Sequence, residues 1–351
     1  MTILDSFPAL PASADGLFAS DQLFASKPWF EAFLSAGVEA GAEPLFFVLN
    51  GAAGPRALVP CQRLPRGDPS ISSLTSFYSC DFRPLIAAGE DEAATTFALG
   101  QKLAEHLSGE AVFGFDSLDS TWAALTPFLK GLARPGRALL RYAHFGRWRE
   151  DLQGRTYDQY LAARDGALRE VIRRKTARLE RDGATFSIVG AGASAAEVET
   201  GIADYEAVYA ASWKEAEPFP TFQPTLMRKL AEAGWLRLAL CHLEGRPIAA
   251  QLWVVAGSTA TVLKLAHDQQ FDKQSPGTAL TAFAIRTLME RPPVDTLDFG
   301  RGDDPYKRGW TTRRTLHIGV RSVGLAQRPM LIARHVLGVA ARKLRGGDSK
   351  A

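Results

Sequence analysis

Two short stretches in the second half of the chain carry residues suited to anion binding and to acid–base chemistry. The first is the loop Lys273-Gln274-Ser275-Pro276-Gly277, which leads into an apolar helical pattern that starts at Thr278. Backbone N–H groups at a helix start bind anions, and glycine lets a phosphate approach the backbone closely. Lys273, Ser275 and Thr278 add donors, so we interpret this loop as a diphosphate-binding turn. Ordinary turn residues before a helix are the alternative.

The second stretch is residues 300–310, where ionisable and aromatic side chains crowd behind a strand pattern. Tyr306 can donate a proton to a leaving thiolate, and Asp303 or Asp304 can accept one from an attacking amine. A solvated turn around a buried aromatic ring is the alternative. His267, which closes the apolar run before the diphosphate loop, is a further catalytic candidate, with a purely structural histidine as its alternative.

The elements around these residues follow one order in both halves of the chain. The second half predicts strands at 235–243, 248–255 and 260–266, a helix at 278–290, a strand at 296–299, a helix at 304–310 and a strand at 315–320. The first half predicts strands at 45–49 and 56–64, an extended run at 72–84, a helix at 93–107, a strand at 112–115, a helix at 122–132 and a strand at 138–142. A shared order suggests duplication, and coincidence remains the alternative.

The composition bounds the class of protein. With 351 residues, 46% of them hydrophobic and 23% charged, the chain predicts a globular protein of two domains. A net charge of +3 from 41 basic and 38 acidic residues argues against a dedicated nucleic-acid binder. Cys61, Cys80 and Cys241 suggest neither a disulfide framework nor a zinc site, and no metal is expected. Residues 1–14 do not resemble a signal peptide, and no apolar run is long enough to cross a bilayer, so we expect a cytoplasmic protein.

The run 236–320 resembles the GNAT acyltransferases. The resemblance implies that an acyl-CoA pantetheine lies along the strand 262–266, beside Leu265 and Ala266, and that its pyrophosphate lies on Gln274–Gly277. Tyr306 matches the place of the general acid. The usual Arg/Gln-x-x-Gly-x-Gly/Ala loop is absent, and the loop found here is similar to the CelD-like and Fem-like branch of double-GNAT proteins. Three more stretches resemble that branch, at 160–180, 212–215 and 298–310, so the likeness covers about residues 20–325.

This resemblance implies an α/β (α+β) fold of two tandem GNAT-like halves, each with a mixed, mostly antiparallel sheet flanked by helices. Residues 1–150 would form a degenerate N-terminal half, 151–325 the half with the acyl-CoA site, and 326–351 a basic helix or tail. The implied activity is an N-acyltransfer in which acetyl-CoA or a longer acyl-CoA is the co-substrate. Backbone N–H groups near Ala266 would stabilise the oxyanion.

An amine acceptor from cell-envelope synthesis, either an amino sugar or an amino-lipid such as a sphingoid base, is the expected partner substrate. Two alternatives stay open. One is a Fem-like transfer of an aminoacyl group from tRNA to a peptidoglycan peptide, and the other is a non-catalytic nucleotide or second-messenger sensor. The residues expected to contact the acceptor are Trp213, Glu217, Phe219, Asp304, Lys307, Trp310 and Arg174.

Two basic segments bear on partners. The helix 168–182 carries Arg174 among many cations, which form a solvated face or contact an anionic acceptor or a CoA phosphate. Aromatic residues are not interleaved with them, so nucleic acid is not expected. The helix 329–345 is both apolar and basic, and it predicts either a docked terminal helix or peripheral contact with the inner membrane face.

Overall fold

The computed structural model describes residues 1–19, 21–290, 293–335 and 337–338, and the chain divides into two compact units. Unit 1 comprises residues 1–18, residues 39–145 and the C-terminal segment from residue 316. Unit 2 comprises residues 19–38 and 146–315. Each unit has its own helices and its own hydrophobic cluster, and their strands belong to one sheet.

Unit 1 is built on a mixed sheet in which the strands follow the order β1-β2-β3-β4-β6-β13-β7. β1 with β2, β2 with β3, β3 with β4 and β6 with β13 are antiparallel pairs, whereas β4 and β6 run parallel. The bounds are β1 Thr2–Leu4, β2 Glu43–Gly51, β3 Gly54–Arg63, β4 Ile71–Ser73, β5 Leu85–Ile86 (paired with β3), β6 Val112–Asp119, β7 Arg137–Asp151 and β13 Arg313–Gly324.

Two helices, α2 (Glu92–His106) and α3 (Leu125–Leu132), pack against each other and close the core of unit 1. Their buried residues join those of the strands in one apolar cluster that includes Leu99, Phe115 and Phe128. Residues 329–335 are helical, and Leu331 and Ile332 pack on a small cluster formed by Val112, Leu140 and Val323. The rest of the predicted 329–345 helix lies largely outside the described residues.

Unit 2 holds the strand order β7-β12-β11-β10-β9-β8. β8 (Thr185–Gly190), β9 (Leu236–Leu243), β10 (Arg246–Ala256) and β11 (Thr259–His267) form an antiparallel series. β12 (Thr296–Arg301) then pairs in parallel with β11 and antiparallel with β7. The core gathers under these strands around large buried side chains such as Trp253, Tyr160 and Phe299.

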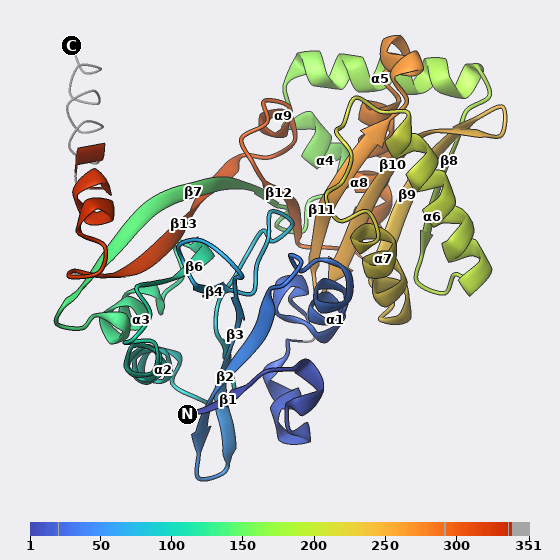
Figure 1. Cartoon of the computed structure of the whole chain (residues 1–351). Helices are drawn as coiled ribbons and strands as arrows, with labels where there is room; N and C mark the ends of the chain where they lie inside the picture. The colour runs from blue at the N-terminus through green and yellow to red at the C-terminus, as the bar shows by residue number, and fades with distance from the viewer. Residues whose placement is uncertain (20, 291–292, 336, 339–351) are drawn as a thin grey trace, which may run out of the picture. The chain divides into compact units, whose positions relative to one another are not determined.

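Helices cover both faces of this sheet, with α6 in front of it and α8 behind it in the view of Figure 1. α6 (Ala195–Ala210) and α7 (Phe222–Glu232) lie on one face, and α1 (Lys27–Ala36) packs on α7 through Trp29 and Phe33 against Phe222. On the other face α8 (Pro276–Glu290) contacts the sheet, and α4 (Tyr157–Ala162) and α5 (Gly166–Arg181) pack on α8. The short η4 (Gln269–Gln274) and α9 (Lys307–Trp310) flank the end of the sheet.

The predicted fold class is confirmed, since each unit shows three antiparallel strands, a helix and a parallel fourth strand in the expected order. Two assignments differ from the sequence-based division. Residues 27–36 form α1, which belongs to unit 2 because its aromatic side chains pack on α7. The last strand, β13, pairs with β6 of unit 1, while the end of β7 pairs with β12 of unit 2.

Candidate functional site

A pocket of about 570 Å³ opens in unit 2 where β11 and β12 separate. The two strands pair only from Thr259 to Thr261 and from Thr296 to Asp298. Beyond these pairs, no described strand occupies this edge of β11, and the start of α8 lies behind it. The lining comes from α5, the end of β11, η4, the start of α8 and the loop into α9: Leu168, Leu265, His267, Asp272, Ser275, Gly277, Thr278, Thr281, Pro305, Tyr306, Gly309 and Trp310.

A β-bulge at Leu263 shapes the strand that borders this pocket. Lys264 pairs with Leu252 and Val262 pairs with Trp253, so Leu263 is an extra residue in β11. A bulge of this kind bends the strand and increases its local twist. The bend accompanies the divergence from β12 that leaves room for the pocket.

The backbone of β11 offers donors to the pocket edge. The Asp268 amide donates to the Ile248 carbonyl at 3.0 Å, that is, toward β10. Because amides along a strand alternate between its two edges, those of Leu265 and His267 point away from β10. The oxyanion donors predicted near Ala266 would therefore be the amides of Leu265 and His267. Ala266 itself is 1% exposed and does not line the pocket.

The start of α8 supplies a second group of donors. Ser275 has a left-handed backbone with φ of 51°, and Pro276 follows as the first helical residue. The amides of Thr278 and Ala279 both donate to the Ser275 carbonyl, whereas no described residue accepts from the Gly277 amide. α8 has no acidic residue in its first turn. An open amide at a positive helix end is a suitable place for an anion.

His267 lies in this pocket and forms a hydrogen bond with Asp272. Its Nε2 is 2.7 Å from Asp272 Oδ1, and its ring contacts the Trp213 ring with centroids 4.7 Å apart. A Cβ built on Gly277 would lie 3.4 Å from His267 Nδ1, so Nδ1 is on the side of the helix start. When Nε2–H donates to Asp272, the lone pair of Nδ1 is available to a proton donor in the pocket.

Tyr306 lines the same pocket from the turn before α9. Its ring is 6.4 Å from that of Phe299, and 41% of the residue remains exposed. Partial burial, and secondarily the charge of Asp304, raise the pKa of the Tyr306 hydroxyl above its usual value. The hydroxyl therefore stays protonated at neutral pH, as a proton donor requires.

Asp303 lies outside the pocket lining. Arg314 donates to its two oxygens at 2.6 and 2.7 Å, and Trp148 Nε1 donates at 3.0 Å. The hydrogen bonds from Arg314 are the main reason that the pKa of Asp303 falls to about 2. A carboxylate of such low pKa, with both oxygens engaged, is a weak base.

Asp304 and Lys307 are paired with each other at 3.0 Å, and neither lines the pocket. The ammonium of Lys307 also donates to the carbonyls of Arg301 and Gly302, with only 5% of its side chain exposed. It therefore holds the turn after β12 in place.

Several other predicted residues also lie away from the pocket lining. Glu217 lies on the opposite side of β11, in an ion pair of 2.5 Å with Lys264, and Phe219 is half-buried in the same segment. Lys273 is exposed and its carbonyl accepts from Lys175, while Arg174 is exposed on α5. Gln274 Oε1 is buried without a hydrogen-bond partner in the described part of the chain.

The structure thus brings Leu265, His267, Ser275, Gly277, Thr278, Tyr306 and Trp310 together in one pocket. Sequence reasoning missed Asp272 as a partner of His267, although a carboxylate in the polar turn after a strand-ending histidine was a usable signal. It also missed Leu168, because only the packing of α5 on α8 brings that residue to the pocket.

Comparison with known proteins places this site in a family. Residues 166–308 match the model of the acetyltransferase (GNAT) domain, and no curated protein gives a significant match. FemX shares the fold over 95% of this chain and 100% of its own, with 13% identity and a TM-score of 0.61. L-PGS from Bacillus licheniformis covers 83% of this chain and 90% of its own, with 13% identity and a TM-score of 0.52.

A third similar structure is the C-terminal domain of a putative lysylphosphatidylglycerol synthetase from Agrobacterium fabrum. It covers 78% of this chain and 83% of its own, with 13% identity and a TM-score of 0.51. Residues 166–308, which lie within unit 2, therefore form a GNAT acetyltransferase domain, and the three structures show that the chain shares its overall fold with proteins of this kind.

Two further observations concern membranes and metals. Among the residues that the structure describes, no helix combines the length and hydrophobicity that crossing a bilayer requires. Within the same ranges, no group of His, Cys, Asp and Glu side chains is arranged to hold a metal ion.

Proposed function

We propose that this protein transfers an acyl group from acyl-CoA to an amine in the pocket between β11 and β12. The observation that carries the proposal is the meeting of three features in one pocket: the open edge of β11, the start of α8 and Tyr306. The match of residues 166–308 to the acetyltransferase domain supports the reaction class. Acetyl-CoA and longer acyl-CoA thioesters are the donors to consider.

The donor would lie along the open edge of β11. Its pyrophosphate would accept from the Gly277 amide at the positive end of α8, with Ser275 and Thr278 beside it. The thioester carbonyl would face the amides of Leu265 and His267, which are fixed by the strand before the reaction starts. Donors that need no reorganisation stabilise a developing oxyanion effectively.

In the reaction, the amine nitrogen forms a bond to the carbonyl carbon, and the carbon–sulfur bond then breaks. His267 Nδ1 accepts the proton that the nitrogen loses, while Asp272 orients the ring through Nε2. Tyr306 gives its hydroxyl proton to the leaving thiolate, and the two residues return to their first protonation states through solvent. No covalent intermediate on the protein is required.

For the acceptor, we propose an amine of a cell-envelope precursor, either an amino sugar or an amino-lipid such as a sphingoid base. The similar fold of two lysylphosphatidylglycerol synthetases supports an acceptor that belongs to the membrane. Peripheral contact at the inner membrane face through the C-terminal segment is part of this proposal. Met330 and Leu337 in that segment are 73% and 69% exposed, whereas Leu331 and Ile332 pack inward.

A second candidate function is a Fem-like transfer from aminoacyl-tRNA. The observations that favour it are the fold shared with FemX over most of the chain and the exposed cations of α5. The two functions differ in the donor. Release of free CoA thiol from acyl-CoA marks the first, and transfer of a labelled amino acid from charged tRNA marks the second.

The test combines a panel of acyl-CoA donors with amino sugars and long-chain amines, and it measures thiol release and the acylated product. Tyr306→Phe should lower kcat about 100-fold or more and leave the donor Kd within a factor of two. Tyr205→Phe is the matched control, because that hydroxyl lies outside the pocket and makes a long bond of 3.4 Å to Gln223. Equal kcat in the two variants would show that Tyr306 takes no part in the mechanism. Tight binding of cyclic dinucleotides without thiol release would instead indicate a non-catalytic sensor.

A further inference from the structure

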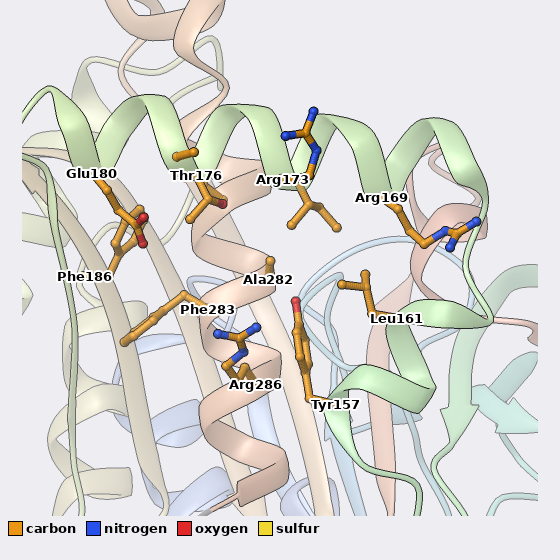
Figure 2. A pocket seen from close by; sticks show the side chains of 13 residues that line it. Tyr157, Leu161, Arg169, Arg173, Thr176, Glu180, Phe186, Ala282, Phe283 and Arg286 are labelled. Atoms are coloured by element: carbon orange, nitrogen blue, oxygen red, sulfur yellow. The ribbon is translucent and has the colours of Figure 1, made fainter.

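A second cavity of unit 2 lies between α5 and α8, and it has no part in the proposed acyl transfer. Its volume is about 370 Å³, within the range of small-molecule sites, and it shares no lining residue with the pocket at β11. Figure 2 shows α5 along one side, α8 along the other and α4 closing one end. The lining residues are Tyr157, Leu161, Arg169, Ile172, Arg173, Thr176, Ala177, Glu180, Phe186, Ala279, Ala282, Phe283 and Arg286. We call this cavity the α5–α8 groove.

Tyr157 presents its hydroxyl to the groove. The residue is 6% exposed, and in Figure 2 its hydroxyl points into the space between α5 and α8. No described residue forms a hydrogen bond with this hydroxyl, although the Arg286 guanidinium lies 4.6 Å from the centre of its ring. Burial raises the pKa of Tyr157, so its hydroxyl is a donor at neutral pH. A hydroxyl donor that faces a cavity and has no partner within the described chain is available to a ligand or to water.

Positive charge gathers around the same end of the groove. Arg169 and Arg286 are exposed, and no described carboxylate pairs with either guanidinium, although that of Arg286 lies over the Tyr157 ring. Arg173 is bound by Glu170 at 2.8 Å on the outer surface of α5. Glu180 is the one acidic residue of the lining, and Figure 2 shows it at the other end. Arg286 over the Tyr157 ring and Arg169 at the start of α5 thus give this part of the groove a positive charge, which matches a carboxylate or phosphate headgroup.

The rest of the groove is apolar. Phe186 and Phe283 face each other with ring centroids 5.5 Å apart, and Ile172 and Ala282 also line the groove. In Figure 2 Ala282 lies between Phe283 and Tyr157. Thr176 Oγ1 is buried here without a hydrogen-bond partner among the described residues. A ligand that fills this part would gain from burying hydrocarbon, about 0.8 kcal/mol per methylene at most.

We propose that the α5–α8 groove binds a single-tailed amphipathic anion, that is, an acidic headgroup carried by one alkyl chain. The headgroup accepts from Tyr157 and pairs with Arg169 and Arg286. The chain lies between Ile172 and the two phenylalanines. A headgroup alone would leave the apolar part of the groove empty, and an alkyl chain alone would leave Tyr157 and the arginines without a partner.

Calorimetry on the full chain tests the ligand class with dodecanoate, dodecyl phosphate and dodecylammonium, each below its micelle concentration. Saturable binding of either anion, with no binding of the cation, supports the proposal, and the stronger of the two anions identifies the headgroup. Affinity should rise with chain length, by up to about fourfold per methylene, until the groove is full. Binding of the cation as strongly as the anions, or affinity independent of chain length, would overturn it.

Three variants locate the site. Tyr157→Phe keeps the ring and removes only the hydroxyl, and it should weaken dodecanoate binding on the order of tenfold, as expected for a bond to a charged group. Arg286→Gln should weaken binding by a similar factor, and Ala282→Leu should block the apolar part. Arg181→Gln is the matched control, because this exposed arginine of α5 does not line the groove.

Equal affinity in Tyr157→Phe and in the unmodified protein would show that the anion binds elsewhere. These variants should leave thiol release from acyl-CoA unchanged. The proposal can therefore fail while the acyltransferase proposal stands, and the reverse is also true.

Discussion

Gly277 gives the sharpest test of where the donor binds. An alanine Cβ at this position would lie 3.4 Å from His267 Nδ1, which is ordinary van der Waals contact, so the substitution fits without displacing the histidine. The methyl group would nevertheless fill the space beside the open amide. Loss of a hydrogen bond from that amide to a charged phosphate costs about 1.5–3 kcal/mol, which corresponds to a donor KM roughly 10- to 100-fold higher.

The same substitution should not destabilise the fold. Alanine is favoured over glycine in helices by about 0.5–1 kcal/mol, so the unfolding midpoint of Gly277→Ala should stay the same or rise. Gly166→Ala is the matched control at the start of α5, where the nearest atom to an added Cβ is Arg169 Nη2 at 3.7 Å. Steady-state thiol release and urea unfolding measure the two effects. A donor KM in Gly277→Ala within threefold of that in Gly166→Ala would refute a pyrophosphate at this helix start.

Three more outcomes follow from the paired carboxylates of unit 2. Asp272→Asn should lower kcat about tenfold and alter its pH profile, because the neutral amide does not stabilise the imidazolium that forms when His267 accepts a proton. An unchanged pH profile would show that this pair has only a structural role. Asp303→Asn should leave kcat within threefold, since Arg314 binds this carboxylate and its pKa is about 2. A larger loss of kcat would indicate that Asp303 is the general base after all. Asp298 is fully buried against Arg147 and has a lowered pKa, so Asp298→Asn should cost about 3–5 kcal/mol in urea unfolding. The Asp298 carboxylate contributes fully to stability above its unfolded pKa of about 3.9, and this contribution is lost as the pH falls through the lower folded pKa. The free energy of unfolding of Asp298→Asn should therefore decrease less in acid than that of the unmodified protein.

Local patterns were sufficient to predict most elements of the fold. The hairpin of β9 and β10 was visible from its turn and its β-branched runs, and α8 was visible from its helical period before two prolines. What the patterns did not contain was the partner of each strand. β7 extends to Asp151 and reaches β12, and β13 pairs with β6, because these pairings join residues far apart in the sequence. Hydrophobic period gives the face of a strand but not its neighbour.

The sequence predicted which residues line the pocket where the backbone determines their position. It predicted side-chain contacts between distant residues less well. Gly277, His267 and Tyr306 follow from a helix start, a strand end and a turn, and these places can be read from spacing. Asp303 was a reasonable base by residue type. Its engagement depends on Arg314, which lies beyond a helix and a turn, and no local pattern shows that contact.

The helix after the third strand differs between unit 1 and unit 2 despite their shared order of elements, and this difference bears on where the proposed donor binds. In unit 1 the corresponding helix is α2, where the side chain of Asp91 already accepts from the Ala94 amide and Glu92 adds a second negative charge to the first turn. Both charges would repel a diphosphate from that helix end. In unit 2, α8 starts with Pro276 and Gly277 and has no acid in its first turn, so the positive end of its dipole stays open to an anion. If the proposed acyl-CoA donor binds at a helix start, the charge there therefore favours α8 of unit 2 over α2 of unit 1.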